Sequence, residues 1–263
     1  MWYTFISRKF FEAWCLYILA MNSSVAQIDR LSPFVSDVYE YYRQPFSWES
    51  SDWLVLGAVA SAVVVTNQYD EELKAYTLQH RSTARKRVTD FGYLWTEFDV
   101  SRPLMIGLWL GGRILDKNSW EQTAYDMVET GFLAVSASEA IKALTQRCRP
   151  NNAESNHRWN EKNCGKAFPS GHTTVGFAMS AALVQNFSQA GAWLSIPAYT
   201  FAMAGAFGRI YDNKHWLSDV IAGAALGHFS AQFIINRRRT QRNKVLHPSL
   251  WLDANQIGVR YIW

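Results

Sequence analysis

The sequence contains few cysteines and, over one long stretch, no charged residue. The first shortage limits the metal sites that can be expected, and the second predicts apolar helices. It has three cysteines and six histidines, which form no cluster with metal-ligand spacing, so no zinc site is expected. Internal repeats and low-complexity tracts are also missing. Between Ala167 and Gly208 there is no Asp, Glu, Lys or Arg, and the segment 185–191 divides this stretch into two predicted apolar helices.

Apolar and aromatic residues are abundant instead. Hydrophobic residues make up 49% of the 263 residues, aromatic residues 15%, and 12 residues are tryptophan, as is typical of lipid-handling or membrane-facing proteins. The net charge of +4 is a local effect, because five positive charges lie between Arg237 and Lys244 and the remainder is slightly negative. This basic strip either contacts anionic lipid headgroups or is a solvated tail, and it does not indicate nucleic-acid binding.

The N-terminus has the pattern of a secretory signal peptide. Two basic residues, Arg8 and Lys9, precede an apolar stretch that only Glu12 interrupts, and the small residues of 24–26 suit cleavage before Gln27. A short uncleaved anchor helix is the alternative. The predicted divisions are a signal peptide, a leader segment with one short helix, a helical domain, and a basic strip with a C-terminal tail: 1–26, 27–52, 53–236 and 237–263.

Apolar runs predict further helices around the central uncharged stretch. Helices are expected at about 122–146 and about 216–236, with a polar loop at 150–166. Hydrophobic side chains at alternate positions near the C-terminus hint at a short terminal β-strand: Ile257, Val259, Tyr261 and Trp263.

The first of three chemically suggestive stretches contains Lys142, Arg149 and Pro150. The two cations lie seven residues apart, about two helical turns, so a helix places them on one face. Pro150 disfavours helix at Arg149, which predicts that the helix gives way to a loop there. Lysine and arginine suit the gripping of phosphate oxygens, although a solvated basic helix end has the same appearance in isolation.

The second stretch is Pro169-Ser170-Gly171-His172, in front of an apolar run, where it predicts a turn that opens a helix. The first N–H groups of a helix are unpaired, and glycine lets a ligand approach them closely. Ser170 adds a hydroxyl donor, and His172 in the first turn is placed to reach a leaving oxygen. An ordinary helix cap followed by a structural histidine is the competing interpretation.

The third stretch joins Arg209 to His215 and Asp219. If residues 215–219 are helical, the histidine and the aspartate share a face. The carboxylate then fixes the imidazole tautomer and leaves the second ring nitrogen available for attack. An i,i+4 surface pair is the simpler interpretation of this spacing alone. The order and spacing of all three stretches favour a single phosphate-handling site.

Lys-x6-Arg-Pro, Pro-Ser-Gly-His and Arg-x5-His-x3-Asp together resemble the three-part signature of the type 2 phosphatidic acid phosphatase superfamily, which includes bacterial acid phosphatases and vanadium haloperoxidases. The resemblance rests on residues 142–219. It implies an all-α fold, a helical bundle of about six core helices with the active site at the helix ends. It also implies His215 as the nucleophile that forms a phosphohistidine, Asp219 as its orienting residue, and His172 as the general acid.

The same resemblance implies a phosphate cradle and no metal. Vanadate enters only as an inhibitor, or as the cofactor of a haloperoxidase. At one position the chain departs from the family, which usually has serine where this sequence has Gly208, and a hydroxyl contact next to Arg209 is thereby lost. The implied cradle residues are Lys142, Arg149, Ser170, Gly171 and Arg209.

Two of the three cysteines fall close to the predicted site. Cys148 lies inside the first stretch and Cys164 in the loop before Pro169, so a disulfide would tie two parts of the site together. Such a bond requires an oxidising compartment, and two free buried thiols are the alternative. Together with the N-terminal pattern, this favours a bacterial-type cell envelope with the site facing the periplasm.

The resemblance thus implies a metal-independent phosphatase of phosphomonoesters or diphosphates, with lipid phosphates as the favoured substrates. A vanadium haloperoxidase and a catalytically silent lipid-phosphate-binding protein are the alternatives. The uncharged runs 53–69 and 220–236 are each 17 residues long, at the lower limit for spanning a bilayer. We expect apolar helices that mostly pack on one another and touch the membrane surface peripherally. The sequence predicts neither the physiological substrate nor the oligomeric state.

Overall fold

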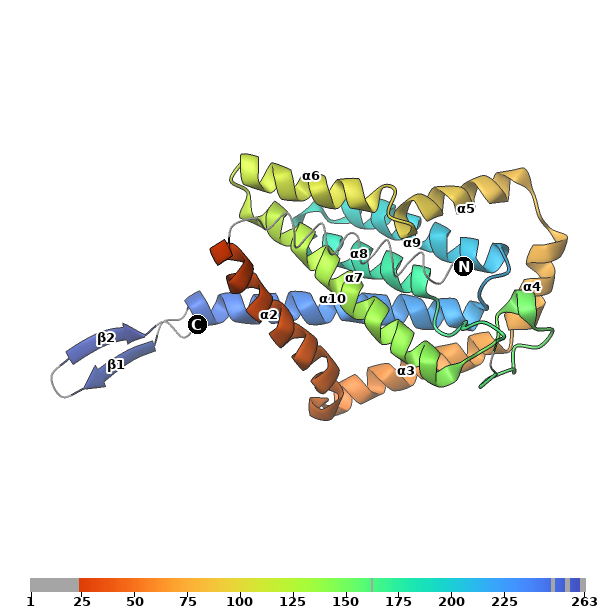
Figure 1. Cartoon of the computed structure of the whole chain (residues 1–263), viewed down its shortest axis with the longest axis horizontal. Coiled ribbons are helices and arrows are strands. Elements are labelled where there is room, and N and C mark those ends of the chain that lie inside the picture. The colour runs from red at the N-terminus through yellow and green to blue at the C-terminus, as the bar shows by residue number, and fades with distance from the viewer. Residues whose placement is uncertain (1–23, 162, 247–248, 254–255, 261–263) are drawn as a thin grey trace.

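The computed structural model describes residues 24–161, 163–246, 249–253 and 256–260, so most of the predicted signal peptide lies outside the described residues. The described part is almost entirely helical (Figure 1). Its α-helices are α2 Ser24–Arg43, α3 Ser50–Asn67, α4 Asp70–Gln79, α5 Thr83–Thr96, α6 Ser101–Ile114, α7 Asn118–Thr145, α8 Gly171–Asn186, α9 Ala192–Tyr211 and α10 Leu217–Leu246. Short 3-10 turns lie at Gln44–Ser47, Pro150–Asn152 and Ser188–Ala190.

The core is a bundle of the six helices α5 to α10, which confirms the expected all-α fold class. Helix α8 is central and packs against α7, α9 and α10, while α5 packs on α9 and α6 on α7. Met127 of α7, Val175 and Met179 of α8 and Trp95 of α5 meet in its buried apolar centre. Fully burying a side chain of this size stabilises the fold by about 1.5–3 kcal/mol.

A two-stranded antiparallel ribbon follows α10, outside the bundle (Figure 1). Its strands are β1 Ser249–Asp253 and β2 Gln256–Arg260, with Ser249 opposite Arg260. The predicted terminal strand overlaps β2 at its first residues, and its end at 261–263 lies outside the described residues.

Two helices are longer than the sequence indicated. In place of one short helix in the leader segment, the 20-residue α2 begins at Ser24, within the predicted signal peptide, and continues into the leader segment, and α10 continues through the basic strip to Leu246. The two extensions support each other, because Arg237 forms an ion pair with Asp37 of α2 and Arg238 Nη1 donates to the same carboxylate at 2.6 Å. Part of the basic strip therefore forms ion pairs with α2.

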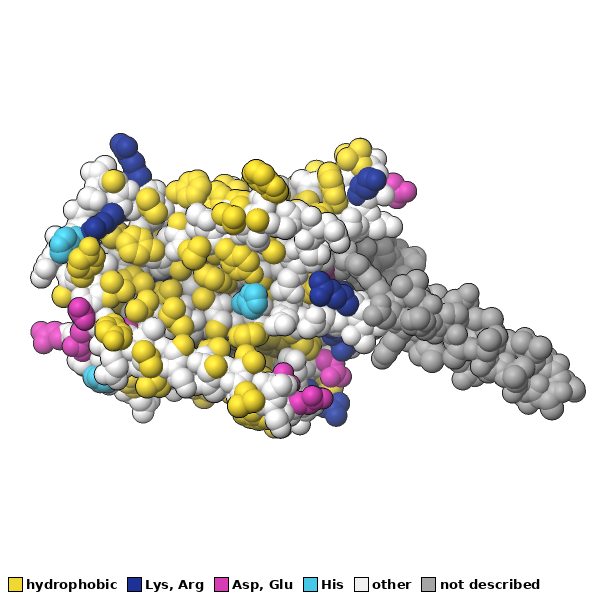
Figure 2. Space-filling model, turned by 180° about the vertical axis from the view of Figure 1, so that it is seen from behind, with side chains coloured by type: hydrophobic (Ala, Val, Ile, Leu, Met, Phe, Trp, Pro, Cys, Tyr) yellow, Lys and Arg dark blue, Asp and Glu magenta, His cyan; other side chains and the backbone are white. Residues whose placement is uncertain are grey.

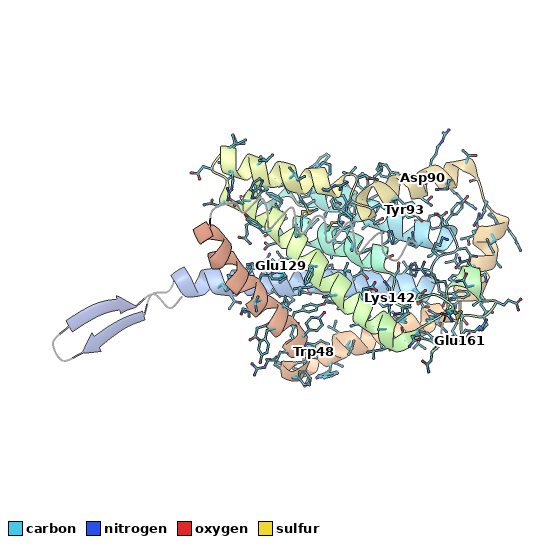
Figure 3. All side chains as sticks on the ribbon, in the orientation of Figure 1. Trp48, Asp90, Tyr93, Glu129, Lys142 and Glu161 are labelled. Carbon is cyan, nitrogen blue, oxygen red and sulfur yellow. A yellow bond between two sulfur atoms is a disulfide. The ribbon has the colours of Figure 1, made fainter. Side chains whose placement is uncertain are left out.

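Helices α7 to α10 run in alternating directions (Figure 1), which gathers particular helix ends at one end of the molecule. The C-termini of α7 and α9 lie there together with the N-termini of α8 and α10. In Figure 3 Lys142 marks this end, while Glu129, on the same helix α7, lies towards the opposite end. The helix N-termini contribute unpaired N–H groups to the end marked by Lys142.

Apolar side chains are exposed over much of the outer surface. No residue of α3 is buried, although most of the helix is apolar, and Trp193 at the start of α9 is 93% exposed. Figure 2 shows hydrophobic side chains spread across the middle of one face, with most charged side chains near its edges. By length and composition, the segments Ser50–Asn67 and Leu217–Gln241 are candidate membrane spans, and half of the second is buried within the bundle.

Candidate active site

The residues predicted from the three sequence stretches come together at the end of the bundle marked by Lys142. Lys142 lies in the last turn of α7, His172 in the first turn of α8, Arg209 in the last turn of α9, and His215 just before α10. Burial lowers the pKa of the His215 imidazole, and the charges of Arg149, Arg209 and Lys142 all lower it further. The side chains therefore belong to one cluster, although they are drawn from four separate elements.

The ammonium of Lys142 occupies space next to Gly171 that a side chain at position 171 would fill. Its side chain is 4% exposed, and its ammonium donates to Glu139 Oε1 at 2.7 Å. A Cβ atom on Gly171 would lie 2.8 Å from Lys142 Nζ, so any other residue at this position would displace the ammonium. Burial lowers the pKa of Lys142, and the neighbouring Arg149 and Arg209 lower it further, while Glu139 acts in the opposite direction.

His215 is held in one tautomer by a backbone carbonyl. Its Nδ1 lies 2.8 Å from the oxygen of Ala167, so Nδ1 carries the proton and donates it. The Nε2 atom is thereby left with its lone pair. Burial lowers the pKa of His215 well below its usual value, and the nearby cations add to the effect, so the ring is neutral.

Asp219 differs from its predicted role in one respect. His215 precedes α10, so the two residues do not share a helical face, and Asp219 Oδ2 lies 3.6 Å from His215 Nδ1, beyond hydrogen-bond distance. The carboxylate instead caps α10 by accepting the backbone N–H of Trp216 at 2.8 Å. It thus contributes charge near the imidazole, while Ala167 fixes the tautomer.

Arg147 anchors Asp219 from behind, and the sequence analysis did not single it out. Its guanidinium is fully buried and donates to Asp219 Oδ1 at 2.6 Å and to Asp70 Oδ2 at 2.8 Å. Asp70, at the start of α4, also accepts from the backbone N–H of Ser218 at 2.9 Å and from its hydroxyl at 2.6 Å. The remaining acceptors of Arg147 are Ser218 Oγ, Asn67 Oδ1 and the Asn156 carbonyl.

His172 faces a second carboxylate that the sequence analysis missed. Its Nε2 lies 3.6 Å from Glu97 Oε1, at the C-terminal end of α5. Burial lowers the pKa of His172 to about 3 and Arg209 contributes to the lowering, whereas Glu97 favours the protonated ring. Nothing in the spacing of the three sequence stretches points to α5, because Glu97 precedes the first stretch by more than 40 residues.

The remaining cradle residues surround these groups. Ser170 is buried and its Oγ accepts from Thr173 Oγ1 at 2.9 Å, which leaves its own hydroxyl proton for another acceptor. Arg149 is half-buried, and its side chain crosses Gly165, which has a φ of +89°. Arg209 is 8% exposed, and its Nε has no hydrogen-bond partner among the described residues.

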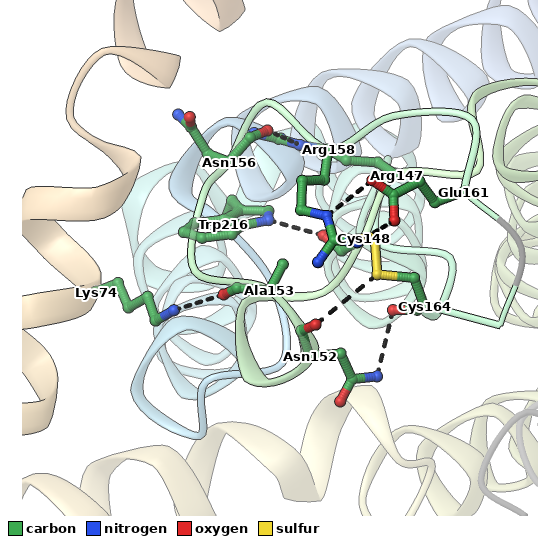
Figure 4. The surroundings of a disulfide bond; sticks show 10 residues. All are labelled: Lys74, Arg147, Cys148, Asn152, Ala153, Asn156, Arg158, Glu161, Cys164 and Trp216. Atoms are coloured by element: carbon green, nitrogen blue, oxygen red, sulfur yellow. Dashed lines mark hydrogen bonds and ion pairs between the residues drawn. A yellow bond between two sulfur atoms is a disulfide. The ribbon is translucent and has the colours of Figure 1, made fainter.

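A disulfide closes the loop that carries Arg149. Cys148 and Cys164 are joined, with their Cα atoms 4.9 Å apart (Figure 4). The Cys148 carbonyl accepts the indole N–H of Trp216 at 2.9 Å, so the loop is connected directly to the segment that carries His215. The disulfide that the sequence suggested is therefore present, and the alternative of two free thiols is wrong for this structure.

Comparison with known proteins agrees with this geometry. The sequence matches the PAP2 superfamily over residues 124–243, a range that contains all three stretches. This part of the chain belongs to the PAP2 superfamily. The proposed cradle and both site histidines of this PAP2 chain fall within the matched range, whereas Glu97 and Asp70 lie before it.

Individual relatives of the PAP2 chain are similar over different extents. The Lipid A 1-phosphatase of Porphyromonas gingivalis is 39% identical over 61 residues, which are 23% of this chain and 14% of that protein. The match therefore spans far less than two thirds of that relative.

Two solved structures align with large parts of this chain. One is a transmembrane PAP2 type phosphatidylglycerolphosphate phosphatase from Bacillus subtilis, with a TM-score of 0.54 and 19% identity over 73% of this chain and 95% of that chain. The other is LpxE from Aquifex aeolicus, with a TM-score of 0.48 and 21% identity over 63% of this chain and 93% of that chain.

Proposed function

We propose that the chain is a metal-independent phosphatase that hydrolyses lipid phosphates through a phosphohistidine at His215. The observation that carries the proposal is the state of this imidazole, whose Nδ1 is 2.8 Å from the Ala167 carbonyl and whose ring is neutral among three cations. A neutral imidazole in a fixed tautomer presents a nucleophilic lone pair on Nε2. The cations stabilise the negative charge of the phosphoryl oxygens as it redistributes during transfer.

In the first step, Nε2 of His215 attacks phosphorus, and a P–N bond forms as the P–O bond to the leaving oxygen breaks. His172 gives its proton to that oxygen. The phosphorylated ring, which keeps its proton on Nδ1, is positively charged, and the Asp219 carboxylate 3.6 Å away stabilises this charge. In the second step, water attacks the phosphohistidine and His172 takes its proton, which releases inorganic phosphate and returns His215 to its neutral state.

The proton that His172 gives away arrives together with the substrate. Burial and Arg209 keep the pKa of His172 at about 3 in the ligand-free site. A bound phosphate anion compensates the cations of the cradle, and Glu97 at 3.6 Å already favours the protonated ring. Substrate binding therefore raises the proton affinity of His172, so that it becomes the general acid only when a phosphate group is bound.

Lipid phosphates are the substrate class that fits the surface around the site. The site lies at the end of a bundle whose outer faces expose apolar side chains, among them Leu54 and Val64 of α3 and Ile114 of α6. A phosphorylated lipid can place its headgroup at the helix ends while its acyl chains contact these faces. The names of the relatives, which are phosphatases of lipid A and of phosphatidylglycerolphosphate, support the same class.

The same surface supports an association of the protein with a membrane of the cell envelope. We propose that α3 and the exposed faces of α6 and α9 contact lipid, because a largely apolar helix without a buried residue, such as α3, is unfavourable in water. The disulfide between Cys148 and Cys164 supports an oxidising compartment such as the periplasm for the site.

The test is phosphate release by purified protein in EDTA, over a panel of lipid phosphates and soluble phosphomonoesters. Wild type and the control His157→Ala, whose side chain is exposed, are expected to release phosphate, and His215→Ala is expected to release none. Release by His215→Ala at the wild-type rate would overturn the proposed nucleophile. Bromide oxidation by the vanadate-loaded protein without phosphate release would favour a haloperoxidase, and tight phosphate binding without turnover would favour a silent binder.

A further inference from the structure

The position before Arg209 is occupied in space by a residue from a distant part of the chain. A Cβ atom built on Gly208 would lie 2.9 Å from Cζ and 3.0 Å from Oη of Tyr93. A serine at position 208, which the family resemblance leads one to expect, would therefore collide with the phenol ring. The tyrosine ring at position 93 therefore requires glycine at position 208.

Tyr93 contacts the groups that surround the last turn of α9. Its hydroxyl donates to Asp212 Oδ2 at 2.8 Å, and the guanidinium carbon of Arg209 lies 5.7 Å from the centre of its ring. Figure 3 shows Tyr93 on α5, at the same end of the bundle as Lys142. The phenol thus connects α5 to both Arg209 and the residue that ends α9.

A close approach of two helices brings Tyr93 into this position. A Cβ atom on Gly92 would lie 2.0 Å from the backbone nitrogen of Gly205, so α5 and α9 pack with their backbones almost in contact. Glu97 follows Tyr93 by one helical turn on α5 and reaches His172. The face of α5 towards the site therefore carries one residue for the arginine and one for the histidine.

Arg209 needs such a neighbour, because the rest of its surroundings leave it incompletely held. Its Nε is buried, yet in the described part of the chain it has no hydrogen-bond partner. An arginine that grips a phosphate must keep its planar guanidinium in one orientation. An aromatic ring against a desolvated guanidinium contributes substantially to holding it.

We propose that Tyr93 positions Arg209 for phosphate binding and takes the place of the serine side chain that this sequence lacks at position 208. The inference rests on the proposed phosphate site but not on the phosphohistidine step. Tyr93 acts through Arg209 as a positioning residue. The ring fills the volume next to the guanidinium, and the hydroxyl, anchored on Asp212, fixes the ring.

The proposal makes opposite predictions for single and paired substitutions. Tyr93→Ala removes the ring, and Gly208→Ser forces a collision with it, so each alone is expected to weaken orthovanadate binding about tenfold or more. The double variant Tyr93→Ala with Gly208→Ser gives the new hydroxyl the vacated space. The double variant is expected to bind orthovanadate at least fivefold more tightly than the single variant with the lower affinity. If the two substitutions acted independently, their losses would instead multiply, and the double variant would bind about a hundredfold less tightly than wild type.

The measurement is the Kd for orthovanadate by isothermal titration calorimetry, with far-UV circular dichroism to verify folding. Tyr93→Phe keeps the ring and is expected to bind within about threefold of wild type, whereas Tyr93→Leu keeps apolar volume without the ring and should resemble Tyr93→Ala. Multiplying losses in the double variant, or equal binding by the Phe and Leu variants, would overturn the proposal.

These binding outcomes are separate from the outcome for the proposed function. If wild type binds orthovanadate but hydrolyses no ester, the phosphatase proposal fails while the Tyr93 variants still test the positioning role. If hydrolysis proceeds and the Tyr93 variants bind as wild type does, the positioning role fails alone.

Discussion

Replacement of Arg147 by methionine tests how far the stability of the fold depends on the buried ion pairs behind the site. The substitution keeps an unbranched side chain and removes the guanidinium. Asp70 and Asp219, both 0% exposed, then lose the donor that contacts them at 2.8 and 2.6 Å. Neither carboxylate can reach water, so each must stay ionised without its counter-charge or take up a proton.

The expected magnitude follows from this burial. Removal of one partner of a buried ion pair destabilises a protein by about 3–5 kcal/mol. For a domain of this size the loss corresponds to a fall in Tm of about 6–20 °C. Lysine at position 147 is expected to restore little, because a compact ammonium cannot contact acceptors that the planar guanidinium reaches together. The matched control is Arg158→Met, whose ion pair with Glu161 is at the surface, where such pairs contribute little to stability.

The assay is thermal unfolding of wild type and variants in one detergent, followed by circular dichroism. Adding Asp70→Asn to Arg147→Met should recover part of the loss, because one of the two unpaired carboxylates is then neutral while its amide oxygen still accepts from Ser218. A Tm for Arg147→Met as high as that of Arg158→Met would show that the two buried carboxylates do not depend on the guanidinium. So would a double variant that unfolds at a lower temperature than Arg147→Met alone.

Four further predictions concern the site and the disulfide beside it. Because the pKa of His172 is about 3 in the empty site and rises when a phosphate anion binds, substrate binding takes up a proton, and kcat, which reports the protonation of the substrate complex, should fall as pH rises through this raised pKa. Glu97→Gln removes the carboxylate that favours the protonated ring, so this fall should begin at lower pH; a profile that coincides with that of wild type contradicts the role of Glu97. Gly171→Ala places a methyl group 2.8 Å from the ammonium of Lys142 and should weaken orthovanadate binding, whereas Gly57→Ala, with no atom within 4 Å, should not; equal affinities would exclude this steric account. Reduction of the disulfide should destabilise the fold by about 3 kcal/mol, measured as a lower Tm with dithiothreitol; an unchanged Tm would show that the loop does not depend on the bond.

The sequence predicted those site residues that belong to short motifs with a fixed spacing. The three stretches identified Lys142, His172 and His215 as one cluster, because helix ends that alternate along a bundle meet at one end. The break at 185–191 also lies where α8 gives way to α9. Local helix-forming patterns and turn residues are sufficient for inferences of this kind.

The rest of the site depends on tertiary contacts that no spacing encodes. Tyr93 and Glu97 lie in a polar stretch with no motif, and they reach the site only because Gly92 and Gly205 let α5 and α9 approach so closely. The tautomer of His215 is likewise fixed by the Ala167 carbonyl, a backbone group that any residue type would present. From the i,i+4 spacing alone, Asp219 was expected to fix the tautomer of His215, whereas the backbone carbonyl of Ala167 fixes it.

The most direct test of the account is to trap the phosphorylated enzyme. Wild type, His157→Ala and His215→Ala are mixed with a substrate labelled in its phosphate, quenched within milliseconds in alkali, and digested for peptide analysis. Wild type and the His157 variant are expected to carry an acid-labile, alkali-stable phosphoryl group on His215, and His215→Ala is expected to carry none. A label on another residue, or hydrolysis by wild type with no covalent label at any quench time, would contradict the proposed phosphohistidine.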